Sequence, residues 1–104
     1  MITTTTRRTD DGWAAVSATS EHHDTRTAAN EVAGAIYDGL GGRSPDIVVL
    51  MASFHHAAAL PQACDDLRRM LVPGHMLAAT VESVLGDGRE LEGLSGMSAL
   101  SIRF

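Results

Sequence analysis

The chain contains no lysine, a single cysteine and few aromatic side chains. All eight basic residues are arginines, and thirteen acidic residues give a formal net charge of −5 at pH 7. Because nucleic-acid binding needs clustered cations to neutralise phosphates, we expect no nucleic-acid partner. The absence of lysine also excludes a phosphate loop of the Walker type, which places a lysine on the phosphates.

Other absences bear on the compartment. The lone Cys64 cannot form an intramolecular disulfide, so nothing indicates an oxidising environment, and its place on an apolar helix face predicts a core residue. No apolar run approaches the ~18–20 residues that cross a bilayer. The N-terminal segment has no apolar stretch typical of a signal peptide. We therefore expect a cytoplasmic protein with no membrane contact.

The length of 104 residues fits a single domain. Residues 1–11 are rich in threonine and charge without periodicity, so we expect a disordered tail there. Residues 12–104 then form one α/β domain. Since aromatic residues are only 4% of the chain, its core must be built mainly from aliphatic side chains and alanine.

Strand and helix patterns alternate along this domain. Strand patterns occupy 12–19, 47–52, 76–81 and 97–104, and helix patterns run over 24–40 and from about 58–60 to 72. The run at 47–52 is apolar without alternation, as in a central strand covered on both faces or flanked by neighbours. The second helix is expected to turn four charged residues to water: Asp65, Asp66, Arg68 and Arg69.

The order of these elements predicts a β-α-β-α-β-β domain of two or three layers. Strands joined through a helix are normally parallel, with right-handed crossovers. The fold class is therefore α/β, with a mostly parallel sheet and an antiparallel last strand.

Polar residues follow the second and third predicted strands. Ligands of open α/β sheets bind at the carboxyl ends of strands, so the candidate ligand-binding residues are Ser53, His55, Thr80, Glu82 and Arg89. Arg89 suits a carboxylate and Glu82 an amine, which favours an amino-acid-like ligand. Alternatively, Glu82 and Arg89 are surface charges of a hairpin. No cofactor is implied.

Two tandem histidine pairs, His22-His23 and His55-His56, lie near the helix starts. They could hold a metal if those starts are adjacent, but zinc sites use separated ligands rather than neighbouring histidines. A Ser53–His55 pair would suit a small hydrolase, yet Ser53 lacks the Gly-x-Ser-x-Gly setting of a nucleophile elbow. We favour solvated loop histidines, with no metal and no catalytic residues.

Two motifs resemble a known family. Pro45-Asp46 opens an apolar strand that ends in Ala52-Ser53, and a later apolar strand through 78–85 runs into Gly-Asp-Gly-Arg-Glu at 86–90. With these motifs the chain resembles the N-terminal half of the FIST sensory domain (F-box and intracellular signal transduction proteins). The resemblance covers Trp13 to Phe104. The family has Gly-Cys at Ala78-Ala79 and a glycine at Ser83. The resemblance implies a divergent, non-enzymatic sensory module for small ligands such as amino acids.

FIST proteins normally carry a further C-terminal half, which the resemblance does not extend to. Without that half, we expect an exposed edge strand or helix-free sheet face near four apolar residues: Met97, Leu100, Ile102 and Phe104. Such surfaces are usually covered by a partner or by self-association, so we expect a homodimer or a companion chain. The alternative function is a protein-interaction or structural module that kept the fold and lost the pocket.

Overall fold

The computed structural model describes residues 2–8, 12–81, 85–86, 89–90 and 96–104. Along the chain the elements are β1 (Ile2–Arg8), β2 (Ala14–Ser20), α1 (Thr25–Gly39), β3 (Ile47–Ser53), the 3-10 helix η1 (Phe54–Ala59), α2 (Leu60–Leu71), β4 (His75–Val81), β5 (Leu85–Gly86), β6 (Arg89–Glu90) and β7 (Met97–Arg103). The predicted helices and the four predicted strands are all present, and the fold class is mixed α/β. No helix among the described residues is long and apolar enough to span a membrane.

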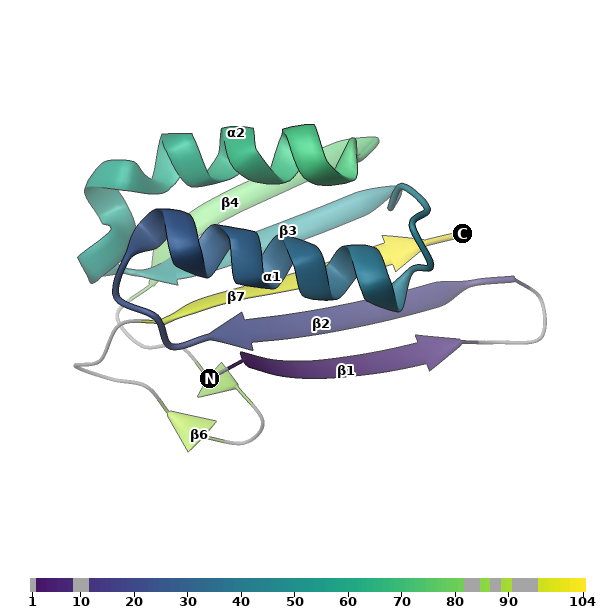
Figure 1. The fold of residues 1–104 in the computed structure, drawn as a ribbon, viewed down its shortest axis with the longest axis horizontal. Coiled ribbons are helices and arrows are strands. Elements are labelled where there is room, and N and C mark those ends of the chain that lie inside the picture. Colours follow the sequence, from purple (N-terminus) through teal and green to yellow (C-terminus); the bar gives the residue numbers. More distant parts are fainter. Residues whose placement is uncertain (1, 9–11, 82–84, 87–88, 91–95) are drawn as a thin grey trace.

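The main sheet has five strands in the order β1-β2-β7-β3-β4. Only β3 and β4 pair in parallel, and the other three pairings are antiparallel. The prediction of a mostly parallel sheet is therefore wrong, although the antiparallel last strand is confirmed. The reason is the position of β7, which inserts between β2 and β3 and separates two strands that would otherwise pair in parallel (Figure 1).

The prediction of a disordered tail over residues 1–11 is wrong for Ile2–Arg8. These residues form β1, which pairs along its whole length with β2, from Ile2 opposite Ser20 to Arg8 opposite Ala14. Threonine is β-branched and favours strands, so the Thr-rich run extends the sheet even without apolar alternation. The Arg8 side chain also donates to the Gly39 carbonyl at the end of α1, at 2.5 Å.

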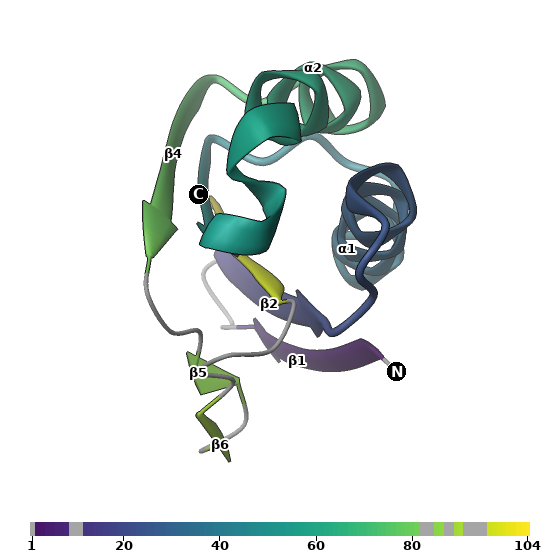
Figure 2. The same cartoon turned by 90° about the vertical axis from the view of Figure 1, so that its left-hand side faces the viewer.

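Both helices cover the same face of the sheet, so the domain has two layers (Figures 1 and 2). The core lies between them and draws on both helices and the three central strands: Val16 and Ala18, Ala29, Val32 and Ile36, Val48 and Leu50, Leu67 and Leu71, Met97 and Ala99. Met97 is thus buried rather than near an exposed surface as expected, because it points to the helix side of β7.

Local sequence explains where the helices begin and end. Asp24 caps α1, and its carboxylate accepts from the Thr27 backbone N–H at 3.0 Å. Gly41 follows with φ of +64°, a left-handed conformation that glycine adopts without strain. Pro61 lies in the first turn of α2, where its missing N–H costs nothing. That helix ends at Val72, which adopts the left-handed conformation with φ of 48°.

Candidate functional site

Ser53, the first predicted ligand-binding residue, ends β3 and is buried. Its Oγ accepts a hydrogen bond from the backbone N–H of Gly96 at 3.1 Å, and its own N–H donates to the Gly96 carbonyl at 2.9 Å. The residue therefore fastens the start of β7 to the end of β3. Its hydroxyl acts as an acceptor within the protein.

His55 and His56 lie on η1, directly after Ser53. His55 Nε2 lies 2.7 Å from the His23 carbonyl, so this ring is also engaged inside the molecule. His56 is fully buried, with Nδ1 2.7 Å from Thr25 Oγ1 and with no hydrogen-bond partner for Nε2. Burial lowers the pKa of His56, and the neighbouring His55 lowers it further. A neutral imidazole at this position is the consequence.

The two histidine pairs meet, because the loop before α1 and the start of η1 are adjacent. The rings of His22 and His23 stack at 5.1 Å, and His22 Nδ1 accepts from the backbone N–H of Asp24 at 3.0 Å. Among the described residues, however, no group of three or more histidine, cysteine or acidic side chains is arranged to hold a metal ion. The cluster joins the two helix starts through hydrogen bonds between segments distant in sequence.

Of the remaining predicted residues, only Thr80 has a described side chain that can be placed relative to Ser53. Thr80 is the register partner of Ala52, so Thr80 and Ser53 point to opposite faces of the pleated sheet. Glu82 lies outside the described residues. Arg89 belongs to β6, which within the described residues pairs with β5 in a separate two-stranded sheet, and its side chain lies outside the description. At the carboxyl ends of the strands, Ser53 and His55 are therefore engaged by other parts of the protein.

The structure holds a groove at another place, between β1 and α1. It has a volume of about 630 Å³ and is lined by Ile2 and Thr4 of the strand and by helix residues that include Asn30, Glu31 and Asp38. The Glu31 carboxylate accepts from Ser20 Oγ at 2.6 Å. No predicted ligand-binding residue lines this groove. The sequence could not indicate it while Ile2–Arg8 was interpreted as a tail.

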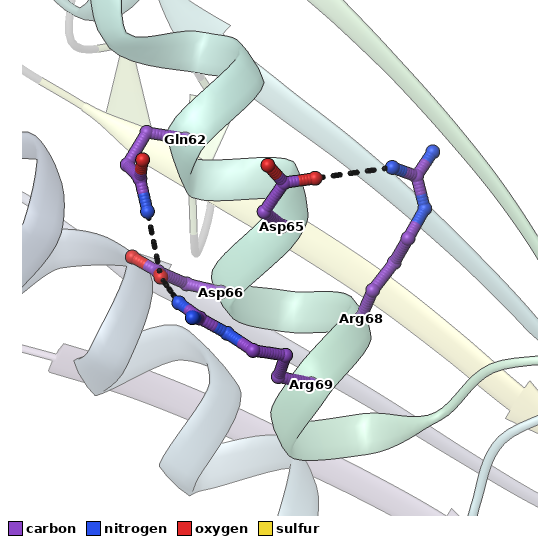
Figure 3. A network of polar contacts seen from close by, with 5 residues as sticks. All are labelled: Gln62, Asp65, Asp66, Arg68 and Arg69. Carbon is purple, nitrogen blue, oxygen red and sulfur yellow. Dashed lines mark hydrogen bonds and ion pairs between the residues drawn. The ribbon is translucent and has the colours of Figure 1, made fainter.

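One charged group on α2 is buried, against expectation. The Asp66 side chain is 5% exposed and accepts hydrogen bonds from Gln62 Nε2, at 3.2 Å, and from Arg69 (Figure 3). Asp65 and Arg68 pair at 3.5 Å on the opposite flank of the helix and are exposed, as predicted. Asp66 departs from the prediction because α2 turns this position away from solvent, where Arg69 compensates its charge.

Cys64 packs against the core, as its position on the helix predicts. Burial raises the pKa of its thiol, which keeps it protonated at neutral pH and unreactive.

The second candidate site is the sheet face that neither α1 nor α2 covers. We call it the open face and define it by side chains that alternate with the core residues on β3, β4 and β7: Ile47, Val49, Met51, Leu77, Ala79, Leu100, Ile102 and Phe104. Val49 lies in register between Leu100 and Leu77, so apolar groups form a row across three strands. Trp13 packs edge-to-face on Phe104 with ring centroids 5.9 Å apart.

Large side chains on the open face are unusually exposed. Leu77 is 66% exposed and Phe104 67%, while Met51 and Leu100 lie close to 40%. The apolar residues Leu100, Ile102 and Phe104, predicted near an exposed surface, are all on this face. The sequence could not show this for the others, because the open face results from the placement of both α1 and α2 on the opposite side of the five-stranded sheet (Figure 2).

Comparisons with known proteins add no relative: no family model, curated protein or solved structure matches this chain. The resemblance to the FIST domain therefore stays a prediction, and the function has to be argued from the two candidate sites.

Proposed function

We propose that this domain is a non-enzymatic protein-interaction module, and that its open face binds an apolar surface of another polypeptide. A single observation carries the proposal: a continuous apolar row, Leu100–Val49–Leu77, lies on the sheet face opposite to α1 and α2. Contiguous exposed apolar patches on a folded domain are typical of interaction sites.

The chemistry of the open face selects the kind of partner. Its described side chains on β2, β3, β4 and β7 include no aspartate, glutamate, lysine or arginine, and serine and threonine lie along the β2 side, at Ser17 and Thr19. Phosphates and lipid headgroups are bound by clustered cations, whereas the basic residues on this side of the described sheet, Arg7 at the β1 edge and His75 at the β4 edge, lie on opposite edges. An apolar centre beside a hydroxyl-rich rim matches the anatomy of a protein–protein interface.

The predicted ligand site supports the same conclusion. Ser53 Oγ and His55 Nε2, two of the polar atoms proposed for ligand recognition, are engaged by Gly96 and His23. A ligand at the carboxyl edge would have to displace these internal contacts.

Site-specific photocrosslinking tests the proposal. A photoreactive amino acid placed at Leu100 should crosslink a partner in the host cell, whereas the same group at Tyr37, exposed on α1, should not. The captured partner is then purified, and its affinity for the wild-type chain is compared with that for Leu100→Asp. We expect at least a tenfold loss of affinity in the variant. Equal affinity for both chains would refute the proposed interface.

A sensory function of the FIST type is the second candidate, and the groove between β1 and α1 favours it. Its carboxylates, Glu31 and Asp38, would suit an amine group better than a carboxylate. A thermal-shift panel of amino acids, amines and small carboxylates tests this function. An amine-selective shift that disappears in Asp38→Asn would support the sensor, and a flat panel would count against it.

A further inference from the structure

We propose that β4 pairs with β4 of a second copy of this chain, antiparallel and centred on Ala78, so that the main sheet continues across a two-fold axis. The contact uses the edge of the sheet rather than the open face. It is therefore a second interaction surface, and it does not depend on the partner proposed above.

The outer edge of β4 has unused backbone groups. Within the described residues β4 pairs only with β3. The His75 N–H donates to the Asp46 carbonyl at 2.8 Å, so His75 and every second residue after it turn their backbone groups toward β3. Met76, Ala78 and Thr80 consequently direct their N–H and C=O groups away from the sheet. An edge of this kind is a template for another strand.

Natural edge strands usually carry protection that β4 lacks. Lysine or other charges, proline and short length are the common devices. The opposite edge strand, β1, ends in Arg7-Arg8. In contrast, β4 has seven residues and contains no proline, acid, arginine or lysine. Ala78 is exposed even though it lies on the helix side of the strand, so neither α2 nor any other described element blocks access to this edge.

The register favours a second copy over an unrelated strand. Ala78 is the middle residue of β4 and one of the outward-directed ones, so a two-fold axis at Ala78 brings two sets of free backbone groups together. Ala78 then exchanges two hydrogen bonds with Ala78 of the second copy, and Met76 does the same with Thr80. On the open face, Leu77 of each copy faces the small Ala79 of the other copy, so the side chains of these two pairs do not collide.

Charge also permits the approach. The exposed flank of α2 carries Asp65 and Arg68, which have opposite signs (Figure 3). Because these two charges pair with each other, this flank presents no net charge that would repel a second copy. Continuation of the sheet would also join the two open faces into one apolar surface.

The test is a charge exchange at the axis, read as molecular mass by light scattering or sedimentation over a wide concentration series. The wild-type chain should reach twice its monomer mass of 11.0 kDa. Ala78→Asp and Ala78→Lys should each be monomeric, because like charges face each other across the axis. An equimolar mixture of the two variants should restore the dimer. Ala78→Ser keeps the backbone groups without charge and should stay dimeric.

Circular dichroism melts of each variant check that the fold is intact, which the exposure of Ala78 predicts. A wild-type chain that stays monomeric at every concentration would overturn the edge dimer. So would a dimeric Ala78→Asp variant, or a mixture that fails to pair. The proposed partner of the open face is judged separately, since Leu100→Asp leaves the β4 edge unchanged. If the photoreactive group at Leu100 crosslinks no partner while the chain still dimerises, the proposed function is refuted and the edge dimer is not.

Discussion

The two faces of the sheet depart in opposite ways from the usual division between an apolar core and a polar surface. Under the helices, four polar side chains are buried with internal partners: Ser20, His56, Asp66 and Ser101. On the open face, Leu77 and Phe104 are about two-thirds exposed. Buried polar groups are stable when they are hydrogen-bonded, whereas exposed apolar groups have no such compensation. The covered face is therefore compensated except at His56 Nε2 and Asp66 Oδ2, which lack a hydrogen-bond partner, and the open face gains most from a partner.

The largest difference between the faces is expected for leucine truncation. Leu50 is fully buried under the helices, and Leu100 on the neighbouring strand is 40% exposed. Leu50→Ala should reduce the free energy of unfolding by about 2–5 kcal/mol, because it leaves a cavity in the core. Leu100→Ala should cost only about 1 kcal/mol, since much of its side chain is already in water. Urea denaturation of both variants measures the difference. Equal losses would mean that the open face is covered in solution.

A smaller effect is expected at Ser53, a buried polar residue at the end of β3 that lies on the side of the sheet away from the helices. Ser53→Ala leaves the buried Gly96 N–H without its acceptor and should cost about 1–3 kcal/mol. The matched control is Ser98→Ala, a residue on the same sheet face by register, which removes only a contact with Thr19 at 3.2 Å. We expect less than about 1 kcal/mol for that variant, because its hydroxyl serves no backbone group. If Ser53→Ala has the same free energy of unfolding as the wild type, the structural role is contradicted. The Ser53 hydroxyl would then again be a candidate for ligand binding.

The contrast between the faces also explains what could be predicted from the sequence. Helix boundaries were predictable, because Asp24 and Pro61 act locally at the ends where they stand. The position of β7 was not, because strand order depends on which neighbours bury Met97 and Ala99, and that choice involves the whole sheet. The apolar run at 47–52 was compatible with coverage on both faces. Only the arrangement of the helices shows that one face is open.

The places of Ser53 and His55 after β3 were predictable from the sequence, but their contacts were not. The sequence placed Ser53 and His55 correctly after a central strand. It could not indicate that Gly96 and His23, far away in the chain, would engage them. Thr80 failed as a neighbour of Ser53 for a simple reason. A shift of one residue in register reverses the face on which a side chain lies, and the register is not visible in a single strand.

The smallest effect at neutral pH concerns His56, whose burial under the helix starts lowers its pKa from the ordinary value of 6.5. The groups around it are His55 on η1, and His22 and Asp24 in the loop before α1. Above about pH 6.5 the imidazole is neutral in both the folded and the unfolded chain, so it adds no pH dependence. As the pH falls below that value, the unfolded chain binds the proton more readily, and stability should decline.

Urea denaturation between pH 7.5 and pH 5 (about one unit above and one and a half below the ordinary histidine pKa) measures this decline. The slope should become shallower in His56→Asn and should persist in His75→Asn, which alters an exposed histidine at the start of β4. Asp24 does not interfere in this range. Hydrogen bonds from Thr27 lower its pKa from 3.8, so its contribution is present above that value and is lost only at still lower pH. An unchanged slope in His56→Asn would show that the covered face accommodates a charged imidazole, and the contrast between the two faces would then be weaker than the structure indicates.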